Sequence, residues 1–327
     1  MKSVIITGGS GYIGRHLVLL FAQSGYNVIS LDKKPGIWEP RYEIQSCEVD
    51  LQHFDEIVEV FKTIDKIDCI IHCAGELGIE KSYAHKNLFY AQNVYVTDNI
   101  LNAAIQFNVK AFIFASSASV YRESSEPLST ESKICNNPSP YSLTKLICEE
   151  RIRRVAQYAN MNYALFRFFN VVGCDVTDDN ALNNYLDKPN LIPIVIQAYK
   201  NNDVVYINGC QYNTPDSTCM RDYINVCDLA RLSLVACSKM ISNEWQSHFN
   251  GLYNVGTGHS HSILDIINMF HEITGKRLEI VIRKARFGDN PYLCADIKNT
   301  TRVFDWVPII TVKETISRII QATMHIP

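Results

Sequence analysis

Short apolar runs alternate with longer segments of helical periodicity through the first half of the chain. The apolar runs cover residues 4–6, 28–31, 69–72, 112–115 and 164–167, and the helical patterns cover residues 16–24, 94–107 and 142–159. Strands that are apolar throughout and separated by helices are typical of a parallel sheet covered on both faces, because each crossover passes over the sheet. The pattern therefore predicts an α/β fold with a doubly wound parallel (Rossmann) sheet.

The alternation weakens after about residue 170. Residues 175–193 are dense in Asp, Asn and Pro, and residues 209–218 form a second polar stretch. Residues 223–239 and 252–256 are apolar again and are candidates for a return to the sheet. A chain of 327 residues is long for a single core, so we expect two units. They are a Rossmann domain of residues 1–169 with about 222–256, and a smaller C-terminal substrate-binding lobe of about 170–221 and 257–327.

Composition and charge exclude several classes of partner. Hydrophobic residues make up 47% and charged residues 20% of the chain, as in globular proteins. The net charge of -3 offers no broad basic surface, so nucleic acid is not an expected partner. No stretch approaches the ~20 apolar residues of a membrane span, so we expect no membrane partner either.

Eleven cysteines are scattered along the chain without a CxxC motif. A zinc site or a redox pair needs clustered ligands, whereas the closest pair here, Cys69 and Cys73, lies in an apolar run. His259 and His261 lack an evident third ligand, so we expect no metal site. Free, mostly buried thiols are usual in a reducing compartment, and the apolar N-terminal run is too short for a signal peptide. We therefore expect a cytoplasmic protein.

Three glycines follow the first predicted strand and open the first predicted helix. Gly8, Gly11 and Gly14 lie in TGGSGYIG. A pyrophosphate can approach a helix N-terminus only where side chains are absent, and there it meets free N–H groups and the positive end of the helix dipole. A plain tight turn has the same spacing. Asp32, at the end of the second strand, can accept hydrogen bonds from ribose hydroxyls and would repel a 2′-phosphate, which favours NAD over NADP.

Other polar positions near this edge have two interpretations. Lys33 and Lys34 could meet a 2′-phosphate or be solvated loop charges. Ligands of doubly wound sheets lie outside the carboxyl ends of the strands, where further residues fall. Candidate adenine and ribose contacts there are Asp50, Leu51, Cys73, Ala74 and Gly75. Asp50 could instead be a helix cap.

Tyr141 and Lys145 lie four residues apart in PYSLTK, directly after Pro140. This spacing places both side chains on one face of a helix, where a lysine ammonium favours the phenolate form of tyrosine. Alone, such a pair could be a surface feature, but behind a glycine-rich strand-helix unit it suggests a base. Ser117 follows the strand of residues 112–115 and could bind a substrate hydroxyl, relay its proton to Tyr141, or cap a turn.

The motifs occur in the order found in the extended short-chain dehydrogenases/reductases, and the chain most resembles the UDP-glucose (UDP-galactose) 4-epimerase group of that family. The segments that carry this resemblance are TGGSGYIG, Asp32, Asp50-Leu51, HCAG, ASSASVY, PYSLTK, FRFFN and MRDYINV. They extend from about Lys2 to beyond Asp296. The resemblance implies an isomerase that holds NAD as a recycled prosthetic group in the Rossmann domain and a UDP-sugar in the second lobe.

The resemblance also implies a mechanism. Tyr141 would take the proton of the sugar 4-hydroxyl while a hydride moves to NAD, Ser117 would assist, and Lys145 would bind the ribose. The 4-keto sugar would turn over and receive the hydride on its other face, with no net redox change. The implied substrate is UDP-Glc/UDP-Gal or UDP-GlcNAc/UDP-GalNAc, and the implied assembly is a homodimer that pairs Tyr83 or residues 89–95.

The binding residues implied by the resemblance fall in both halves of the chain. For NAD they are Gly8, Gly11, Tyr12, Ile13, Gly14, Asp32, Asp50, Leu51, Cys73, Ala74, Gly75, Asn93, Tyr141, Lys145 and Phe168. For the substrate they are Ser117, Tyr141, Asn170, Asn190, Leu191, Arg221, Arg286, Asp289 and Leu293. Arginine forks suit a diphosphate, although the two arginines could also be surface charges.

Some positions depart from the family pattern. Leu77 replaces a Lys that often approaches the cofactor, and Leu293 stands where bulk limits the substituent on sugar carbon 2. The other departures are Arg122, Val171, Cys219 and Met220. UDP-glucuronate 4-epimerase, reductase and dehydratase activities, or a non-catalytic NAD-sensing role, are the alternatives. A dehydratase needs an acid where this chain has Ala118 and Ser119, and a reductase needs exchangeable NADPH, which Asp32 disfavours.

Overall fold

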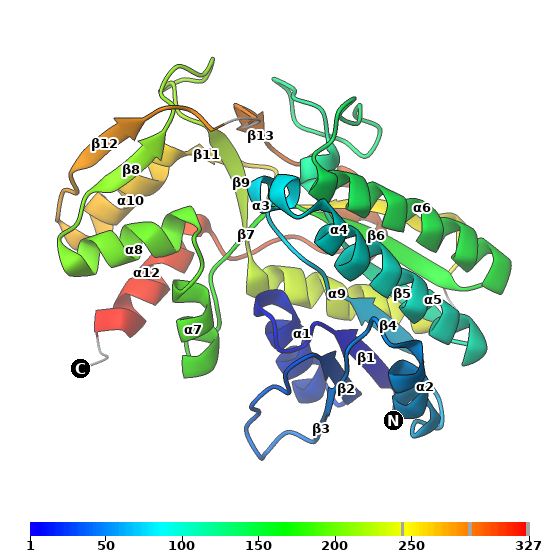
Figure 1. Ribbon diagram of the computed structural model, residues 1–327. Helices are drawn as coiled ribbons and strands as arrows, with labels where there is room; N and C mark the ends of the chain where they lie inside the picture. Colours follow the sequence, from blue (N-terminus) through cyan, green and yellow to red (C-terminus); the bar gives the residue numbers. More distant parts are fainter. Residues whose placement is uncertain (243–244, 287–289, 325–327) are drawn as a thin grey trace.

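The structure, a computed structural model, describes residues 1–242, 245–286 and 290–324 (Figure 1). These residues form a seven-stranded sheet of order β10-β6-β5-β4-β1-β2-β3, in which every pair of neighbours is parallel. Its strands are β1 (Ser3–Thr7), β2 (Asn27–Asp32), β3 (Ile44–Glu48), β4 (Cys69–His72), β5 (Ala111–Ser117), β6 (Asn162–Phe168) and β10 (Gly251–Val255). The predicted doubly wound parallel sheet is confirmed.

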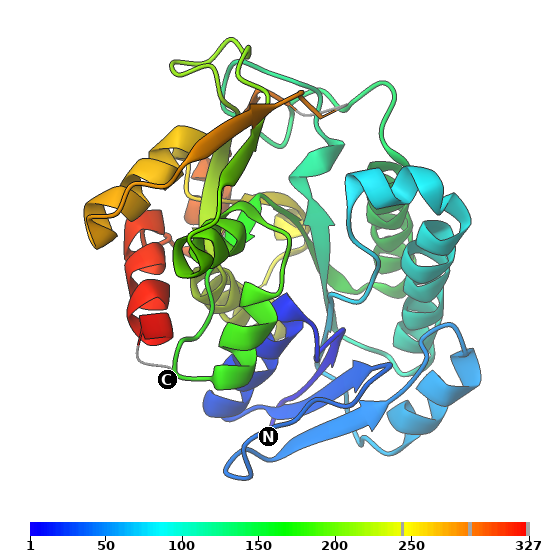
Figure 2. The same ribbon diagram turned by 60° about the vertical axis from the view of Figure 1, so that its left-hand side comes forward.

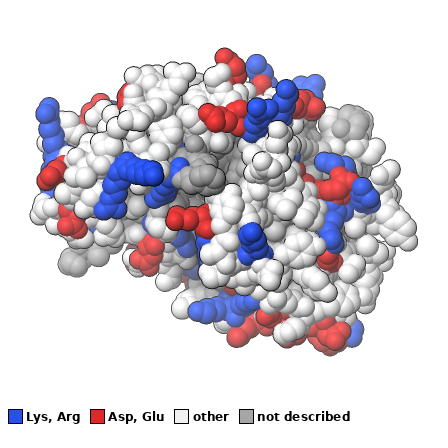
Figure 3. All heavy atoms as spheres, turned by 45° about the horizontal axis from the view of Figure 1, so that its top comes forward, with Lys and Arg blue, Asp and Glu red and all other residues white. Residues whose placement is uncertain are grey.

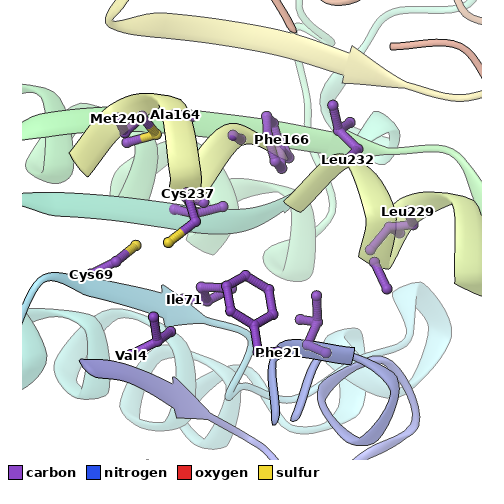
Figure 4. Packing of buried hydrophobic residues seen from close by; sticks show 14 of the residues in the cluster. Val4, Phe21, Cys69, Ile71, Ala164, Phe166, Leu229, Leu232, Cys237 and Met240 are labelled. Carbon is purple, nitrogen blue, oxygen red and sulfur yellow. The ribbon is translucent and has the colours of Figure 1, made fainter. Parts of the chain in front are cut away.

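Helices cover both faces of this sheet. One face packs against α1 (Tyr12–Gln23), α9 (Val226–Ile241) and α11 (Lys298–Phe304), and the other against α2 (Phe54–Lys62), α5 (Val96–Gln106) and α6 (Pro140–Ala159). Side chains alternate along each strand, so Val4 and Ile6 of β1 enter the first core and Ile5 enters the second. Figure 4 shows the first core, where Cys69 and Cys237 point toward each other between sheet and helix.

The second half of the chain builds a smaller lobe. Its main sheet has the order β11-β9-β13, with β7 paired to β9, and β12 pairs with β8 in a separate ribbon. These strands are β7 (Asn170–Val172), β8 (Val205–Asn208), β9 (Met220–Asn225), β11 (Ser260–Ser262), β12 (Ile280–Arg283) and β13 (Tyr292–Leu293). The helices α7 (Asp179–Leu186), α8 (Leu191–Asn201), α10 (Ile263–Thr274) and α12 (Val312–Met324) share a core with them. Figure 2 shows this lobe on one side of the large sheet, opposite α5 and α6.

Short helices complete the connections. Between β4 and α5 lie α3 (Ile79–Ala84), α4 (Lys86–Phe89) and a π-helix (Tyr90–Tyr95), and two 3₁₀ helices span Ala118–Val120 and Ser247–Phe249. The π-helix runs directly into α5, so the helical pattern predicted over residues 94–107 begins earlier in the structure and changes its winding within the segment.

The structure corrects three sequence-based expectations. Strand β3 was not predicted because its sequence, IQSCE, mixes polar and apolar residues at the edge of the sheet. Helix α1 begins at Tyr12, directly after the glycine turn, four residues before the predicted start. Of residues 223–239, the first three lie in β9 of the smaller sheet, where Tyr223 joins the core of the second lobe, while Ile224 and α9 pack on the large sheet. The predicted return of residues 252–256 is confirmed for β10, which pairs with β6.

Candidate functional site

The carboxyl ends of the parallel strands bring the predicted cofactor residues to one edge of the large sheet. Thr7, the last residue of β1, pairs with Leu31 of β2 and with His72 of β4. Ser117 of β5 pairs with Phe168 of β6 in the same way. The residues that follow these strands therefore share the edge at which doubly wound folds bind ligands.

The glycine turn after β1 leaves no room for larger residues. Gly8 has φ +68°, and a Cβ there would lie 2.8 Å from the amide nitrogen of Ala74. A Cβ on Gly14 would lie 2.0 Å from the carbonyl oxygen of Gly8. Gly11 is the N-cap of α1, and within 4 Å a Cβ there would meet only the Gly8 oxygen among the described residues. The N-terminus of α1 is thus open to an anion, as a bound pyrophosphate requires.

Asp32 is the last residue of β2 and lies at the same edge of the sheet. Its Oδ2 accepts a hydrogen bond from the Ser10 amide (3.1 Å) and its Oδ1 one from the Lys34 amide (3.3 Å). Each carboxylate oxygen can accept more than one such bond, so both retain acceptor capacity for hydroxyl groups.

Asp50 takes part in a local structure of its own. The Gln52 amide donates to Asp50 Oδ1 (3.0 Å), which makes a side-chain turn, and Lys33 Nζ lies 3.3 Å from Asp50 Oδ2. Lys33 is therefore an ion-pair partner in the structure rather than an isolated loop charge. The Leu51 side chain is buried in the core, so contact with a ligand would have to involve its backbone.

Asn93 holds the turn after β4 against α6. Its Oδ1 accepts a hydrogen bond from the Glu76 amide (2.7 Å), and its Nδ2 donates to Thr144 Oγ1 (2.9 Å). Asn93 is 2% exposed, and Gly75 approaches it so closely that a Cβ would lie 2.7 Å from Asn93 Oδ1. The turn residues predicted to contact the cofactor are thus fixed beside Lys145, the residue that follows Thr144.

Tyr141 and Lys145 occupy the first turns of α6. Ser139 caps this helix by accepting a hydrogen bond from the Ser142 amide, and Pro140 is its first residue. Both side chains are largely buried, with Tyr141 8% and Lys145 3% exposed. Lys145 Nζ lies 5.9 Å from the centroid of the Tyr141 ring and donates to the carbonyl oxygen of Ala115 (2.8 Å). The helix and the end of β5 are joined at the predicted base.

The charge of Lys145 also affects two buried neighbours, His72 and Cys73. Burial lowers the pKa of His72 to about 3, and the nearby Lys145 charge contributes in the same direction. His72 is therefore neutral, and Thr7 Oγ1 (2.6 Å) and Thr97 Oγ1 (3.0 Å) bind its two ring nitrogens. Burial raises the pKa of Cys73 to about 12 against the opposing effect of Lys145, so this thiol carries no charge.

Ser117 is the last residue of β5 and lies at the same edge of the large sheet. Its Oγ accepts a hydrogen bond from the Ser119 amide (3.2 Å), so it caps the 3₁₀ helix as one interpretation predicts. That bond uses the oxygen as an acceptor and leaves the hydroxyl proton available to another group. Ser142 Oγ donates to Ser119 Oγ (3.0 Å), which links the serine run to the start of α6 beside Tyr141.

Three predicted substrate residues share the small sheet of the second lobe. Leu293 of β13 pairs with Arg221 of β9, and Asn170 of β7 pairs with Tyr223 of the same strand. Arg221 Nη1 donates to the carbonyl oxygens of Met220 (2.9 Å) and Asn290 (2.6 Å). The proposed determinant of sugar size therefore lies directly beside the proposed diphosphate ligand.

The remaining substrate candidates are more dispersed. Asn190 and Leu191 begin α8, and the exposed Arg286 follows β12, with Nε and Nη2 each 3.2 Å from the Asn208 amide oxygen in the orientation that satisfies both groups. Asp289 lies outside the described residues. On the face shown in Figure 3, basic and acidic side chains are interspersed, without a broad area of one sign.

The side chain of Tyr12 reaches across to the second lobe. Its hydroxyl donates to the Gly173 carbonyl (2.5 Å), and its ring lies 5.5 Å from that of Tyr185. The neighbouring Ile13 packs against the core on the sheet side of α1. For both residues, contact with a cofactor at the glycine turn falls to the backbone.

Asp222 is a site-forming residue that the sequence analysis missed. It is fully buried and accepts hydrogen bonds from the Thr257 amide and hydroxyl (both 2.7 Å), the Gly258 amide (2.9 Å) and the Ala295 amide (3.1 Å). Burial raises the pKa of this carboxyl group. Asp222 thereby fastens β9 to the turn after β10 and to the chain after Leu293. The only signal was a charge inside the apolar segment MRDYINV.

An open helix N-terminus and a carboxylate at the ends of adjacent parallel strands are the architecture of a dinucleotide-binding α/β protein. Comparison with known sequences narrows this class. Residues 4–256 match the NAD dependent epimerase/dehydratase family, and the chain belongs to that family.

Several characterised relatives cover nearly the whole chain. It is 30% identical over 308 residues to the UDP-glucose 4-epimerase of Halalkalibacterium halodurans, covering 94% of this chain and 90% of the relative. It is 31% identical over 319 residues to UDP-glucose 4-epimerase 2 of Arabidopsis thaliana, covering 93% and 90%. The crystal structure of UDP-glucose 4-epimerase from Bifidobacterium longum with NAD+ and UDP superposes with a TM-score of 0.86 at 28% identity, covering 100% and 99%.

Within residues 1–242, 245–286 and 290–324, no three His, Cys, Asp or Glu side chains are grouped as a metal ion would need. None of the helices in those ranges has the length and apolar character required to cross a membrane. All eleven cysteines lie in the described ranges, and none of them forms a disulfide bond there.

Proposed function

We propose that this protein is an NAD-dependent isomerase that reversibly epimerises a UDP-hexose at carbon 4 through a 4-keto sugar. The observation that carries the proposal is the buried Tyr141–Lys145 pair, which is joined to the end of β5 at the ligand-binding edge of a Rossmann sheet. Family membership and the UDP-glucose 4-epimerase relatives support the same activity.

The residues at the glycine turn fit NAD. Gly8, Gly11 and Gly14 would admit the pyrophosphate to the N-terminus of α1, and Asp32 would accept hydrogen bonds from the adenosine ribose. Lys33 and Lys34 could both have favoured a 2′-phosphate, but Lys33 is already engaged in an ion pair with Asp50. When bound, NAD supplies a hydride acceptor that later returns the hydride.

The chain's own residues would move the proton and hold the reactants. Tyr141 would take the proton of the 4-hydroxyl, and Ser117 would donate its free hydroxyl proton in a hydrogen bond to the same sugar oxygen. Lys145 would stabilise the tyrosinate through its charge and bind the nicotinamide ribose. Its bond to Ala115 keeps the ammonium group fixed during both half-reactions.

The second lobe would bind the UDP group and let the sugar turn. Arg221 would meet the diphosphate, with Asn170 on the neighbouring strand. Leu293 would border carbon 2 of the sugar, and its size leaves both the plain and the N-acetylated hexose as substrates. We assign residues 1–169 and about 222–256 to cofactor binding, and about 170–221 and 257–327 to the nucleotide sugar.

Incubation of the purified protein with UDP-Glc, UDP-GlcNAc and UDP-GlcA, followed by NMR of the products, tests the activity. We expect inversion at carbon 4 for at least one of the first two sugars without added NADH. Unchanged stereochemistry at carbon 4 in all three would defeat the proposal, and NAD unaltered by every sugar nucleotide would favour a sensing role instead.

We further propose a homodimer. Apolar side chains stand exposed along α3, α4, the π-helix and the start of α6, namely Tyr83, Leu88, Tyr90, Tyr95 and Leu143. We call these five residues the apolar patch. Phe89 lies in the segment predicted for pairing but is fully buried, so it cannot contribute directly. We also propose a cytoplasmic location, because eleven cysteines without a disulfide bond fit a reducing compartment.

A further inference from the structure

A cavity of about 810 Å³ lies beside β10, the edge strand of the large sheet. It is bordered by β10, α6, α11 and the segment of residues 130–134. None of the residues predicted for NAD or the sugar nucleotide lines it. On α6, Arg153 at the cavity is 12 positions beyond Tyr141, which corresponds to about 18 Å along the helix. The cavity is therefore separate from the proposed active site.

The charges around this cavity are mainly positive. Arg153, Arg167 and Arg302 line it, and Glu131 is the acidic residue among its lining side chains. Arg153 and Arg302 are exposed side chains on α6 and α11. Arg153 pairs with Glu150 and Arg302 with the amide of Asn299, and such exposed contacts are weak enough for an arginine to turn toward a ligand at small cost.

Arg167 has an unmatched donor. Its Nε and Nη2 bind both carboxylate oxygens of Glu149 (2.9 and 2.6 Å), and its guanidinium group lies 4.6 Å from the centroid of the Tyr121 ring. Arg167 is only 4% exposed, and its buried Nη1 has no hydrogen-bond acceptor among the described residues. Buried guanidinium N–H groups are nearly always matched, so Arg167 would gain from an acceptor placed beside it at the cavity wall.

The lining also provides weaker polar and apolar contacts. Ser132 and Asn299 offer a hydroxyl and an amide, and Leu252 and Tyr253 of β10 offer apolar surface. A few placed polar groups within an otherwise mixed lining are typical of small-molecule sites. Planar guanidinium groups match the geometry of carboxylate and phosphate oxygens.

We propose that this cavity binds a small molecule through an oxyanion, a phosphate or a carboxylate group. Arg167 flanks the anion in the cavity wall, and Arg153 and Arg302 close on it from the two helices. The site is distinct from the diphosphate site proposed for the sugar nucleotide, and it does not depend on the epimerase activity.

Isothermal titration calorimetry of the protein with inorganic phosphate, and separately with succinate, at constant ionic strength tests this site. We expect saturable binding of one of the two anions in the millimolar range. Binding of phosphate alone identifies a phosphorylated ligand, and binding of succinate alone identifies a carboxylate. Arg153→Gln and Arg302→Gln should each weaken it about tenfold, because a charged hydrogen-bond partner is lost.

Arg154→Gln is the matched control. Arg154 is exposed, lies next to Arg153 on α6 and binds the same Glu150, but it does not line the cavity. It should leave the affinity unchanged. Thermal melting by circular dichroism verifies that each variant folds as the wild type does, and the two cavity variants on separate helices provide independent readings.

Three results would overturn the proposal. The first is no saturable heat with either anion up to tens of millimolar. The second is wild-type affinity in both Arg153→Gln and Arg302→Gln, which would place any binding at the nucleotide site. The third is an equal loss in Arg154→Gln, which would mean that the anion responds only to the overall surface charge.

Discussion

The hydroxyl of Tyr141 is the atom on which the proposed chemistry depends. Tyr141→Phe keeps the ring that packs 6.2 Å from Phe89 and removes the base. We expect kcat for epimerisation to fall by about 10²–10⁴-fold with NAD still bound, because only proton transfer is lost. Tyr158→Phe, an 83% exposed position on the same helix, should keep the wild-type rate in the same coupled assay. Full activity of Tyr141→Phe would refute the assigned base.

Buried His72 should make the folded state sensitive to acid. Its pKa is lowered to about 3, so the folded protein does not take up a proton there when the unfolded chain does, below about pH 6.5. This contribution to stability is complete above the unfolded pKa and is lost as the pH falls from there toward 3.

The free energy of unfolding in urea, compared between wild type and His72→Gln, measures this effect. Between about pH 6 and pH 5 the advantage of the wild type should shrink by about 1.4 kcal/mol, since one proton is taken up by the unfolded chain. Parallel pH profiles for the two proteins would show that His72 is protonated equally in both states.

Single residues were predicted best where residues close to them in the sequence determine their geometry. Tyr141 and Lys145 share a helical face because they are four residues apart, and Gly8 precedes a helix because of the local turn. The partners of these residues depend on distant parts of the chain. Nothing in the local sequence shows that Lys145 binds the Ala115 carbonyl or that Asn93 binds Thr144.

At the scale of secondary-structure elements, Asp222 decides how β9, β10 and β13 meet. Its two carboxylate oxygens accept four hydrogen bonds, from Thr257, Gly258 and Ala295. In Asp222→Asn an NH₂ group replaces one of the two carboxylate oxygens. The buried donors that bound this oxygen would then face another donor and lose their acceptor. We expect the free energy of unfolding in urea to fall by about 2–4 kcal/mol.

The exposed Asp203 provides the comparison for this substitution. Asp203→Asn removes the same charge and should change the free energy of unfolding by no more than about 0.5 kcal/mol. An equal effect of the two substitutions would show that net charge, rather than the contacts of Asp222, determines the loss.

Elements with a strong hydrophobic pattern were predicted, and those set by tertiary pairing were not. The fully buried β1 and β4 gave clear apolar runs. By contrast, β3 is an edge strand whose partly exposed residues need no apolar pattern, and it is defined by its pairing with β2. Strand β9 is apolar enough for the large sheet, and only its pairing with β7, β11 and β13 places it elsewhere.

For the whole molecule, the apolar patch should control assembly. Carboxylates at both Tyr95 and Leu143 would be desolvated in a dimer, so the Tyr95→Glu/Leu143→Glu protein should sediment as a monomer while the wild type sediments as a dimer. The double variant Ile37→Glu/Ile309→Glu, at exposed positions outside the patch, should remain dimeric in the same ultracentrifugation experiment. A monomeric wild type, or a dimeric patch variant, would contradict the proposed interface.

The order of the strands gives the protein a property of its synthesis. Strand β10 occupies one edge of the large sheet, yet it is reached only at residue 251, after the first segment of the second lobe, about residues 170–221, has been made. Until residue 251 has been made, β6 presents an unpaired edge, although α9, which covers the first core, precedes β10 in the chain. A chain cut short before residue 251 would therefore leave the edge of β6 open to pairing with other chains.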